Sequence, residues 1–245
     1  MDTTGEARIP KQRSIAWRLR RLVGNLLLAI GAGVLIWAFI VWKWNDPLTS
    51  LYTRWQQHKL VAEHALVVEN YRPSKPIPVS ATRQEAAVAI AAEARRMRAG
   101  AAVGAPIGRI IVPRLHLNVL MVNGTDSDSL RRGPGRDART FMPGQGKLVY
   151  IAGHRTTYLA PFSAIDSMRP GDRITLSMPY GTFVYSVTGH RIVDAHDLSV
   201  LKSRGHEVVA LQACHPRFFA SHRYIVWAKP VRVEPAKGRP YRPTN

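Results

Sequence analysis

The sequence predicts an all-β domain that follows a membrane-spanning helix and a helical stalk. From Pro106 onward, short runs of β-forming residues are separated by Gly, Pro and Asp. Such strand-and-turn spacing is typical of an antiparallel barrel or sandwich. No long helical patterns alternate with these runs, which argues against a doubly wound α/β fold. Residues 22–42 form a 21-residue stretch without charge, and about 20 apolar residues cross a bilayer as a helix.

The flanks of this apolar stretch predict its topology. Residues 1–21 carry six basic and two acidic side chains, which predicts a cytoplasmic N-terminus. A cleaved signal peptide would have a shorter apolar region and a small-residue cleavage site, whereas this stretch ends in bulky Trp42-Lys43-Trp44. We therefore expect an uncleaved anchor at residues 22–42, with the rest of the chain outside the cell. The aromatic residues near its outer end are typical of an interfacial belt: Trp37, Trp42, Trp44, Tyr52 and Trp55.

Residues 43–105 are expected to form the stalk and a linker. Asp46 before Pro47 is typical of a helix N-cap with proline in the first turn, and a helix should run over residues 48–70. Residues 71–80 contain three prolines and should be an extended linker.

A second stalk helix is predicted to follow this linker. Thr82 and Glu85 have the spacing of a capping box, and an Ala-rich stretch continues to Gly100. Nothing in the two helices points to chemistry, and the sequence leaves two roles open: they regulate access to the domain, or they only separate it from the membrane.

The folded domain is expected at residues 106–233, with a tail at 234–245. One short helix is plausible at residues 162–168, before a turn. The expected strands are 108–112, 119–122, 147–152, 173–177, 182–188, 191–194, 207–213 and 223–233.

Charge and cysteine content exclude several kinds of protein. The chain has 35 Lys and Arg against 16 Asp and Glu, a net charge of +19. These basic residues are spread along the chain and are not interleaved with aromatics on one motif, which argues against nucleic-acid binding. An anionic envelope polymer or a lipid surface is the simpler partner. The single cysteine, Cys214, excludes an intrachain disulfide framework and a zinc ribbon.

Cys214 is the first candidate for chemistry. It follows the apolar run 207–213 at the point where a turn begins. A buried structural thiol is the common alternative, but an unpaired thiol outside the membrane is open to oxidation. If the flanking strands form a hairpin centred on Phe218-Phe219, Arg223 lies opposite Cys214. Its guanidinium would then stand beside the thiol, where it could bind a carbonyl or an oxyanion. A solvated strand-end charge is the alternative for Arg223.

His154 is the candidate base for this thiol. It lies in Gly-His-Arg-Thr-Thr, residues 153–157, where a strand is expected to enter a loop. His215 and His222 are nearer to Cys214 in sequence, but each adjoins Cys214 or Arg223 and should face the other side of its strand. A zinc site made of Cys214, His215 and His222 has poor ligand spacing.

These motifs together resemble the sortase family, and most of all the class E sortases of actinobacteria. Gly-His-Arg-Thr-Thr comes first, Leu-Gln-Ala-Cys-His-Pro follows at residues 211–216, and Arg223 comes last. Gly-Pro-Gly, Met-Pro-Gly, Pro-Phe and Pro-Gly-Asp also occur in the family's order, so the resemblance covers residues 106–233. It implies an eight-stranded β-barrel with short helices and a cofactor-free transpeptidase. Cys214 would be the nucleophile, His154 the general acid/base and Arg223 the transition-state stabiliser.

The resemblance also implies a substrate class. A secreted protein would carry a C-terminal sorting signal of the LPxTG or LAxTG kind, be cleaved between Thr and Gly, and be transferred to an amine of a peptidoglycan precursor or a pilin. The family commonly has Thr where this chain has Ala213, at a position expected to contact substrate. Thr156, Thr157 and Tyr158 are expected to line the substrate groove, with an ordinary loop as the alternative.

The order of residues along the chain argues against two other kinds of cysteine enzyme that act on the cell wall. L,D-transpeptidases carry Ser-His-Gly-Cys, which is absent, and papain-like wall hydrolases place Cys before His, whereas His154 comes first here. The Ala213 departure leaves open a catalytically impaired, sortase-like envelope scaffold or binding module.

Overall fold

The computed structural model describes residues 15–44, 47–74 and 77–244. The chain divides into two units, Met1–Trp44 and Asn45–Asn245. The helix N-cap expected at Asp46 and most of the expected cytoplasmic segment lie outside the described residues. The described helices are α1 (Ile15–Trp44), α2 (Pro47–Asn70), α3 (Arg83–Gly100) and α4 (Ser127–Arg132). The strands are β1 (Pro106–Val112), β2 (Leu117–Asn123), β3 (Gly135–Arg136), β4 (Leu148–Ala152), β5 (Arg173–Met178), β6 (Gly181–Asp194), β7 (Val208–His215) and β8 (His222–Pro235).

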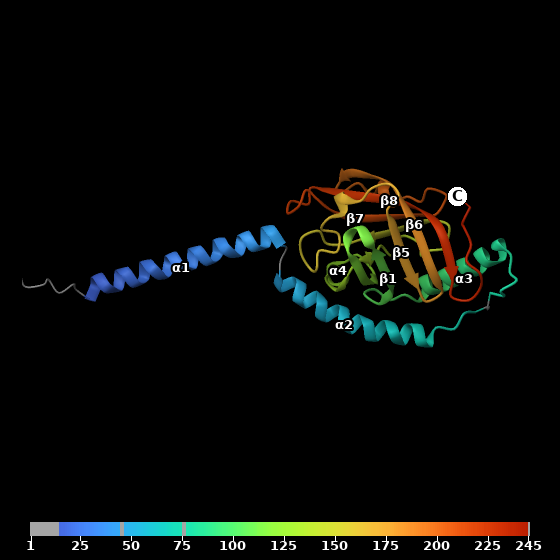
Figure 1. The fold of residues 1–245 in the computed structure, drawn as a ribbon, viewed down its shortest axis with the longest axis horizontal. Helices are drawn as coiled ribbons and strands as arrows, with labels where there is room; N and C mark the ends of the chain where they lie inside the picture. Colours follow the sequence, from blue (N-terminus) through green and yellow to red (C-terminus); the bar gives the residue numbers. More distant parts are fainter. Residues whose placement is uncertain (1–14, 45–46, 75–76, 245) are drawn as a thin grey trace, which may run out of the picture. The chain divides into compact units, whose positions relative to one another are not determined.

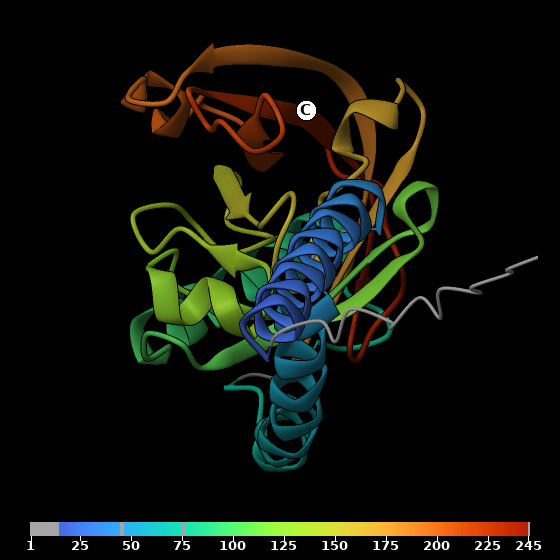
Figure 2. The same ribbon diagram turned by 90° about the vertical axis from the view of Figure 1, so that its left-hand side faces the viewer.

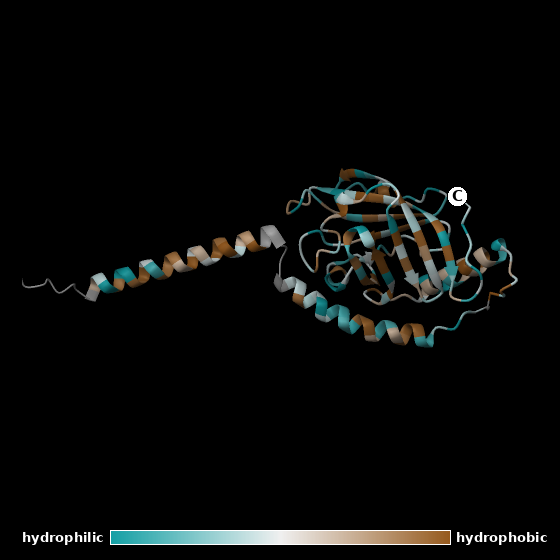
Figure 3. Cartoon of the chain, in the orientation of Figure 1, coloured by the Kyte–Doolittle hydropathy of each residue, from teal (hydrophilic) through white to brown (hydrophobic). Residues whose placement is uncertain are grey.

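The first unit consists of helix α1. Its segment Ala16–Ile40 is long and apolar enough to cross a membrane, and none of the most apolar stretch is buried. Brown, hydrophobic residues run along most of the helix, with hydrophilic residues in its first turns (Figure 3). The predicted apolar helix of membrane-spanning length is therefore confirmed.

The second unit is built on a closed barrel of eight strands in the order β1-β2-β3-β4-β7-β8-β6-β5, which confirms the predicted eight-stranded barrel. The long strands β6 and β8, orange to red, run side by side (Figures 1 and 2). Two pairs, β2 with β3 and β4 with β7, are parallel, so the barrel is not purely antiparallel as its turn spacing predicted. Parallel neighbours need a long crossover connection, and short-range turn signals do not reveal one.

Other differences from the predicted elements are local. The segments expected as separate strands at 182–188 and 191–194 form the single strand β6, with a register shift between Val187 and Gly189. The helix expected at 162–168 is only a 3₁₀ turn, Ile165–Ser167. Strand β3 and helix α4 were not predicted, because elements of 2 and 6 residues are too short to show a hydrophobic period.

Alternation along the strands decides which side chains enter the barrel. In β7, Val209, Leu211 and Ala213 belong to the main core. Their neighbours Val208 and Ala210 face the other way, into a smaller apolar cluster on the outside of the sheet. Since side chains of a strand alternate between its faces, Cys214 belongs to the outer face.

The two stalk helices are present, and both pack against the barrel. Ile90 and Ala94 of α3 are buried in the main core, and the capping box of Thr82 with Glu85 begins this helix as predicted. From α2, Leu60 is 0% exposed and packs against β2. This packing explains why α2 follows the side of the barrel in Figure 1.

A polar side chain of α2 strengthens this contact. Gln57 donates hydrogen bonds from Nε2 to the carbonyl oxygens of Leu120 and Arg132, and its Oε1 accepts one from the Leu120 amide. The helix is thus hydrogen-bonded to the backbone of β2 in addition to its apolar contact.

Candidate active site

The parallel pairing of β4 with β7 brings His154 to Cys214. Ala152 at the end of β4 lies in register with Gln212 of β7. The Gly153 amide then donates to the Gln212 carbonyl oxygen over 3.0 Å, which extends the ladder by one residue. Two residues beyond the Ala152–Gln212 pair, the same register reaches His154 and Cys214, which both follow the outer-face alternation.

The antiparallel pairing of β7 with β8 places the third residue. Cys214 lies opposite Arg223, and His215 lies opposite His222, so the hairpin expected from the sequence is confirmed. His154, Cys214 and Arg223 therefore follow one another across three neighbouring strands.

These three residues line one cleft of about 280 Å³ on the outer face of the sheet. Tyr150 and Gln212, from β4 and β7, also line it. The segment between β6 and β7 adds an apolar wall of Leu198, Val200 and Leu201. Charged side chains also line the cleft: Asp137, Arg139 and Asp197. The cleft therefore combines apolar side chains with polar and charged groups beside the Cys214 thiol.

Burial changes the acid-base properties of His154. Desolvation by burial, and secondly the charge of Arg131, lower the pKa of His154 below its ordinary value. Its Nε2 is buried and has no hydrogen-bond partner. A histidine with a lowered pKa is neutral at physiological pH, and a neutral imidazole can accept a proton from a thiol.

Arg223 is held by the turn of its own hairpin. Its Nη1 donates hydrogen bonds to the carbonyl oxygens of Ala220, at 2.7 Å, and His222, at 3.0 Å. The guanidinium also acts on Tyr150: burial raises the pKa of that phenol, and the charge of Arg223 opposes this shift. Arg223 thus enters the cleft in a fixed position, with donors left over for a substrate oxygen.

Arg155 joins the two loops of the site. Its side chain is 3% exposed and pairs with Asp166 over 2.6 Å. The Nη1 atom donates to the carbonyl oxygen of Cys214 and contacts Nδ1 of His215. Because Arg155 follows His154 directly, one buried guanidinium fixes the loop of the histidine to the strand end of the cysteine.

Gly153 is required by the packing beneath His154. A Cβ at this position would lie 2.7 Å from the ring of Phe162, which is fully buried in the core. The Phe162 amide donates in turn to the His154 carbonyl oxygen over 3.1 Å. Only glycine allows the backbone to pass this close to the ring. Gly153 therefore determines how closely the backbone that carries His154 lies against the barrel core.

Comparison with known proteins shows the family of this domain. Residues 110–231 match the family model of the sortase domain. This chain belongs to the sortase family. The resemblance expected from the sequence is therefore confirmed, and the closed eight-stranded barrel is the fold typical of sortases.

Relatives of more than one sortase class are similar to this chain. Sortase D of Bacillus subtilis is 27% identical over 209 residues, which cover 84% of this chain and 96% of that protein. Sortase SrtE1 of Streptomyces coelicolor is 32% identical over 146 residues, 53% of this chain and 42% of that protein. The crystal structure of Sortase E1 from Streptomyces coelicolor with a tripeptide in the active site matches with a TM-score of 0.51 and 28% identity, covering 54% of this chain and 91% of that one.

The other residues expected at the substrate site are placed differently. Ala213 is 0% exposed and its side chain lies in the barrel core, because it alternates with Cys214 along β7. It offers no surface to a substrate. Thr156, Thr157 and Tyr158 lie half-buried in the loop after His154 and are not part of the lining of the cleft.

Several site residues were missed by sequence reasoning. Arg155 was visible as part of the His154 motif, but its contact with Cys214 depends on the strand pairing. Tyr150 and Gln212 could have been found from the alternation that places Cys214 outward. Among the residues that the structure describes, no group of three or more His, Cys, Asp or Glu side chains is arranged to hold a metal.

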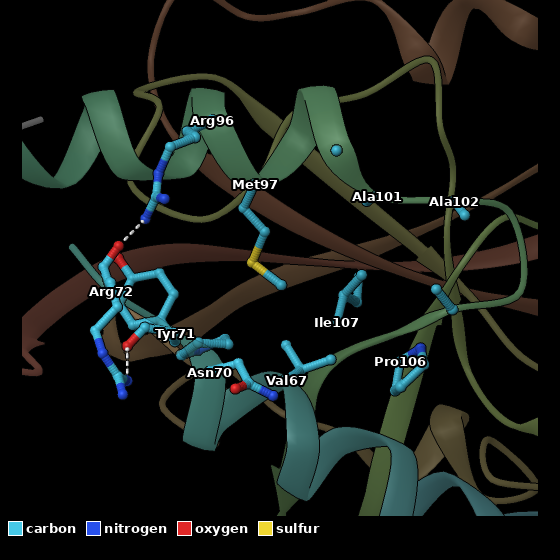
Figure 4. A pocket seen from close by; sticks show the side chains of 13 residues that line it. Val67, Asn70, Tyr71, Arg72, Arg96, Met97, Ala101, Ala102, Pro106 and Ile107 are labelled. Carbon is cyan, nitrogen blue, oxygen red and sulfur yellow. Dashed lines mark hydrogen bonds between the residues drawn. The ribbon is translucent and has the colours of Figure 1, made fainter. Parts of the chain in front are cut away.

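A second cavity, of about 350 Å³, lies away from these groups. It is bounded by the end of α2, by α3 and by the start of β1, with Met97 and Ile107 among its apolar lining (Figure 4). At one end the Arg96 guanidinium donates to the carbonyl oxygen of Arg72. The described residues that line this second cavity include no cysteine, serine, threonine or histidine. The cleft at Cys214 is therefore the candidate active site.

Proposed function

We propose that this sortase is a membrane-anchored cysteine transpeptidase of the class E type. Family membership supports a cysteine transpeptidase. The observation that carries the residue assignment is that one cleft is lined by His154, which follows the end of β4, by Cys214 of β7 and by Arg223 of β8. A nucleophilic thiol with a base on one side and a cationic donor on the other is the arrangement that acyl transfer requires.

The first half-reaction would form a thioester. Sγ of Cys214 attacks the Thr carbonyl carbon of the sorting signal while neutral His154 takes the thiol proton. The carbonyl oxygen becomes an oxyanion, and Arg223 donates hydrogen bonds to it. When the C–N bond breaks, His154 returns its proton to the Gly amine, which leaves, and the acyl group remains on Cys214.

The second half-reaction would transfer the protein to its acceptor. An amine of a peptidoglycan precursor or a pilin attacks the thioester, and His154 takes one of its protons. The tetrahedral adduct collapses, the thiolate leaves, and protonated His154 restores the Cys214 thiol. A new amide bond replaces the peptide bond that was cleaved, and no cofactor enters the balance.

The substrate class follows from the resemblance and is compatible with the cleft. The apolar side chains Leu198, Val200 and Leu201 suit the small and apolar first residues of LPxTG or LAxTG. The SrtE1 similarity, higher in identity, favours class E. The Sortase D similarity covers more of the chain. Comparing LAxTG with LPxTG peptides therefore tests the class as well as the activity.

The location of the enzyme is part of the proposal. The apolar helix α1 would hold the chain in the membrane, with the basic N-terminus inside and the barrel outside. Secreted proteins that carry C-terminal sorting signals would then meet the cleft as they leave the membrane.

The proposal is tested by trapping the acyl-enzyme. Purified full-length protein in a mild detergent is incubated with LAxTG and LPxTG peptides, and intact mass is measured. A mass increase equal to the N-terminal peptide fragment is expected for the wild type and absent for Cys214→Ala. His154→Ala and Arg223→Ala should each lower turnover about a hundredfold or more.

Matched controls separate these roles from general damage. His222→Ala and Arg191→Ala alter an exposed histidine and an exposed arginine beyond the cleft and should keep wild-type turnover. A wild-type thiol that neither forms the adduct nor reacts with iodoacetamide in the folded protein would contradict the proposal. That result would favour the alternative, a catalytically impaired envelope scaffold.

A further inference from the structure

The loop that follows His154 contains a strained turn. Tyr158, Leu159 and Ala160 are three successive residues with positive φ, at 51°, 63° and 40°. In this region the Cβ of a non-glycine residue crowds the following carbonyl oxygen. Such a conformation persists only where surrounding contacts enforce it, and it is found most often at functional sites.

The first two turns of helix α2 hold this loop. The Tyr158 amide donates a hydrogen bond of 2.9 Å to Oγ1 of Thr49. The ring of Tyr52, one turn further along α2, meets the Tyr158 ring edge to face with centroids 6.4 Å apart. The Arg131 guanidinium of α4 lies 5.8 Å from the centroid of the same ring. Contacts from two separate helices thus converge on one residue of the loop, through its backbone amide and its ring.

Tyr158 in turn covers His154. Their ring centroids are 5.0 Å apart at an interplanar angle of 40°. The imidazole is half-buried, and its Nε2 is buried without a partner. No hydrogen bond fixes that end of the ring, and the imidazole packs directly against Tyr158. The same packing removes water from the ring and so contributes to the burial that lowers the pKa of His154.

We propose that Tyr158 is the positioning residue for His154, and that Thr49 and Tyr52 of α2 hold Tyr158 in its strained conformation. The proposal rests on the catalytic role proposed above for His154. Helix α2 begins at Pro47, three positions after α1 ends at Trp44. The segment that leaves the membrane helix would therefore set the geometry of the acid/base group, in addition to spacing the domain from the membrane.

The test uses three matched pairs in the full-length protein. Thr49→Val removes the acceptor oxygen and Thr49→Ser keeps it. Tyr52→Leu and Tyr158→Leu remove an aromatic ring, whereas Tyr52→Phe and Tyr158→Phe keep it. The titration of His154 is followed by NMR in ¹³C-histidine-labelled protein, with its signal identified from its loss in His154→Gln. The pH profile of kcat/KM, kcat, KM and Tm are measured alongside.

The expected result separates the two members of each pair. Thr49→Val, Tyr52→Leu and Tyr158→Leu should raise the pKa of His154 toward its ordinary value and shift the acid limb of kcat/KM in the same direction. Their kcat should fall about tenfold to a hundredfold with little change in KM, since a displaced catalytic group affects the transition state most. Thr49→Ser, Tyr52→Phe and Tyr158→Phe should keep the wild-type titration and rate.

Two results would overturn the proposal. One is a His154 titration that is the same in Tyr158→Leu as in the wild type. The other is equal loss in both members of a pair together with a lowered Tm, which would make these residues merely structural. The NMR titration needs no turnover. A wild type without acyl-enzyme formation therefore refutes the proposed function, while the titration still decides whether Tyr158 positions His154.

Discussion

Arg155 donates a hydrogen bond from Nη1 to the backbone carbonyl oxygen of Cys214 across 3.2 Å, although the two residues are 59 positions apart. The other side of the guanidinium pairs with Asp166. The strand end with the proposed nucleophile and the loop with the proposed base are therefore held by one buried side chain.

Replacing Arg155 with methionine should loosen this connection. The variant keeps an unbranched apolar side chain but loses the bonds to Cys214 and Asp166. We expect the free energy of unfolding to fall by about 1.5–3 kcal/mol, since bonds to charged groups are worth this much. The rate of acyl-enzyme formation should fall with it. Urea unfolding and intact-mass kinetics measure the two effects.

The control for this variant is Arg169→Met, because Arg169 is exposed. It should change neither quantity. Equal losses from the two variants would show that the contact of Arg155 with Cys214 has no special importance.

Substituting Gly153 with alanine should displace the histidine loop. The added Cβ would lie 2.7 Å from the Phe162 ring, which is too close for any real contact. Overpacking of this kind costs about 1–3 kcal/mol, and relief of the clash must move His154 or Phe162. We expect lower Tm and reduced turnover. Gly189→Ala is the control, because its added Cβ has nothing within 4 Å, and its Tm and turnover should stay near the wild-type values. Equal losses in the two variants would show that the clash with Phe162 is not the cause.

The pH dependence of turnover should follow the protonation of the His154 imidazole. Burial and the charge of Arg131 lower its pKa, so the imidazole is still neutral below pH ~6.5, the ordinary histidine value. If His154 accepts the thiol proton, kcat/KM falls only when the pH drops through this lowered pKa. Arg131→Gln removes a repulsive positive charge and should move the acid limb to higher pH.

Arg109→Gln is the matched control for that experiment, because the charge of Arg109 acts on His64 and is not among the causes that shift His154. It should leave the activity profile in place. An acid limb that does not move in Arg131→Gln would show that it belongs to another group.

Stability should also depend on pH, through two histidines. Burial, and then a nearby arginine charge, lower the pKa of both His64 and His154 in the folded protein. Between these lowered values and about 6.5, the unfolded chain binds more protons than the folded one. The free energy of unfolding should therefore fall as the pH is lowered through this window.

Replacing one of these histidines should reduce that slope. His64→Gln removes one of the two titrating groups, whereas His222→Gln changes an exposed histidine and should leave the slope unchanged. Urea unfolding between pH 5 and 8 in a mild detergent makes the comparison. A slope in His64→Gln as steep as that of the wild type would exclude His64 as a contributor.

Local features of this protein could be predicted because they depend on neighbouring residues. The uncharged stretch at residues 22–42 is long enough to define the apolar helix α1 without any tertiary contact. The period-2 pattern of 207–213 and 223–233 located β7 and β8. A short turn between them then required Cys214 to lie opposite Arg223.

The alternation of side chains along β7 also fixes the position of Ala213, which was not predicted from it. Cys214 on the outer face obliges Ala213 to face the core, so Ala213 could have been recognised as a packing residue from the same pattern. The left-handed conformation of residues 158–160 could not have been recognised, since none of the three is a glycine.

What the sequence by itself determined is therefore the apolar helix of membrane-spanning length, most strand positions, the Cys214–Arg223 hairpin and, by resemblance, the family. Tertiary structure alone decided the parallel pairing of β4 with β7, which brings His154 to Cys214, and the docking of α2 on the loop of Tyr158. The physical reason is distance along the chain. A hairpin is specified by its turn, but two segments 60 or 100 residues apart meet only when the whole core that lies between them has formed.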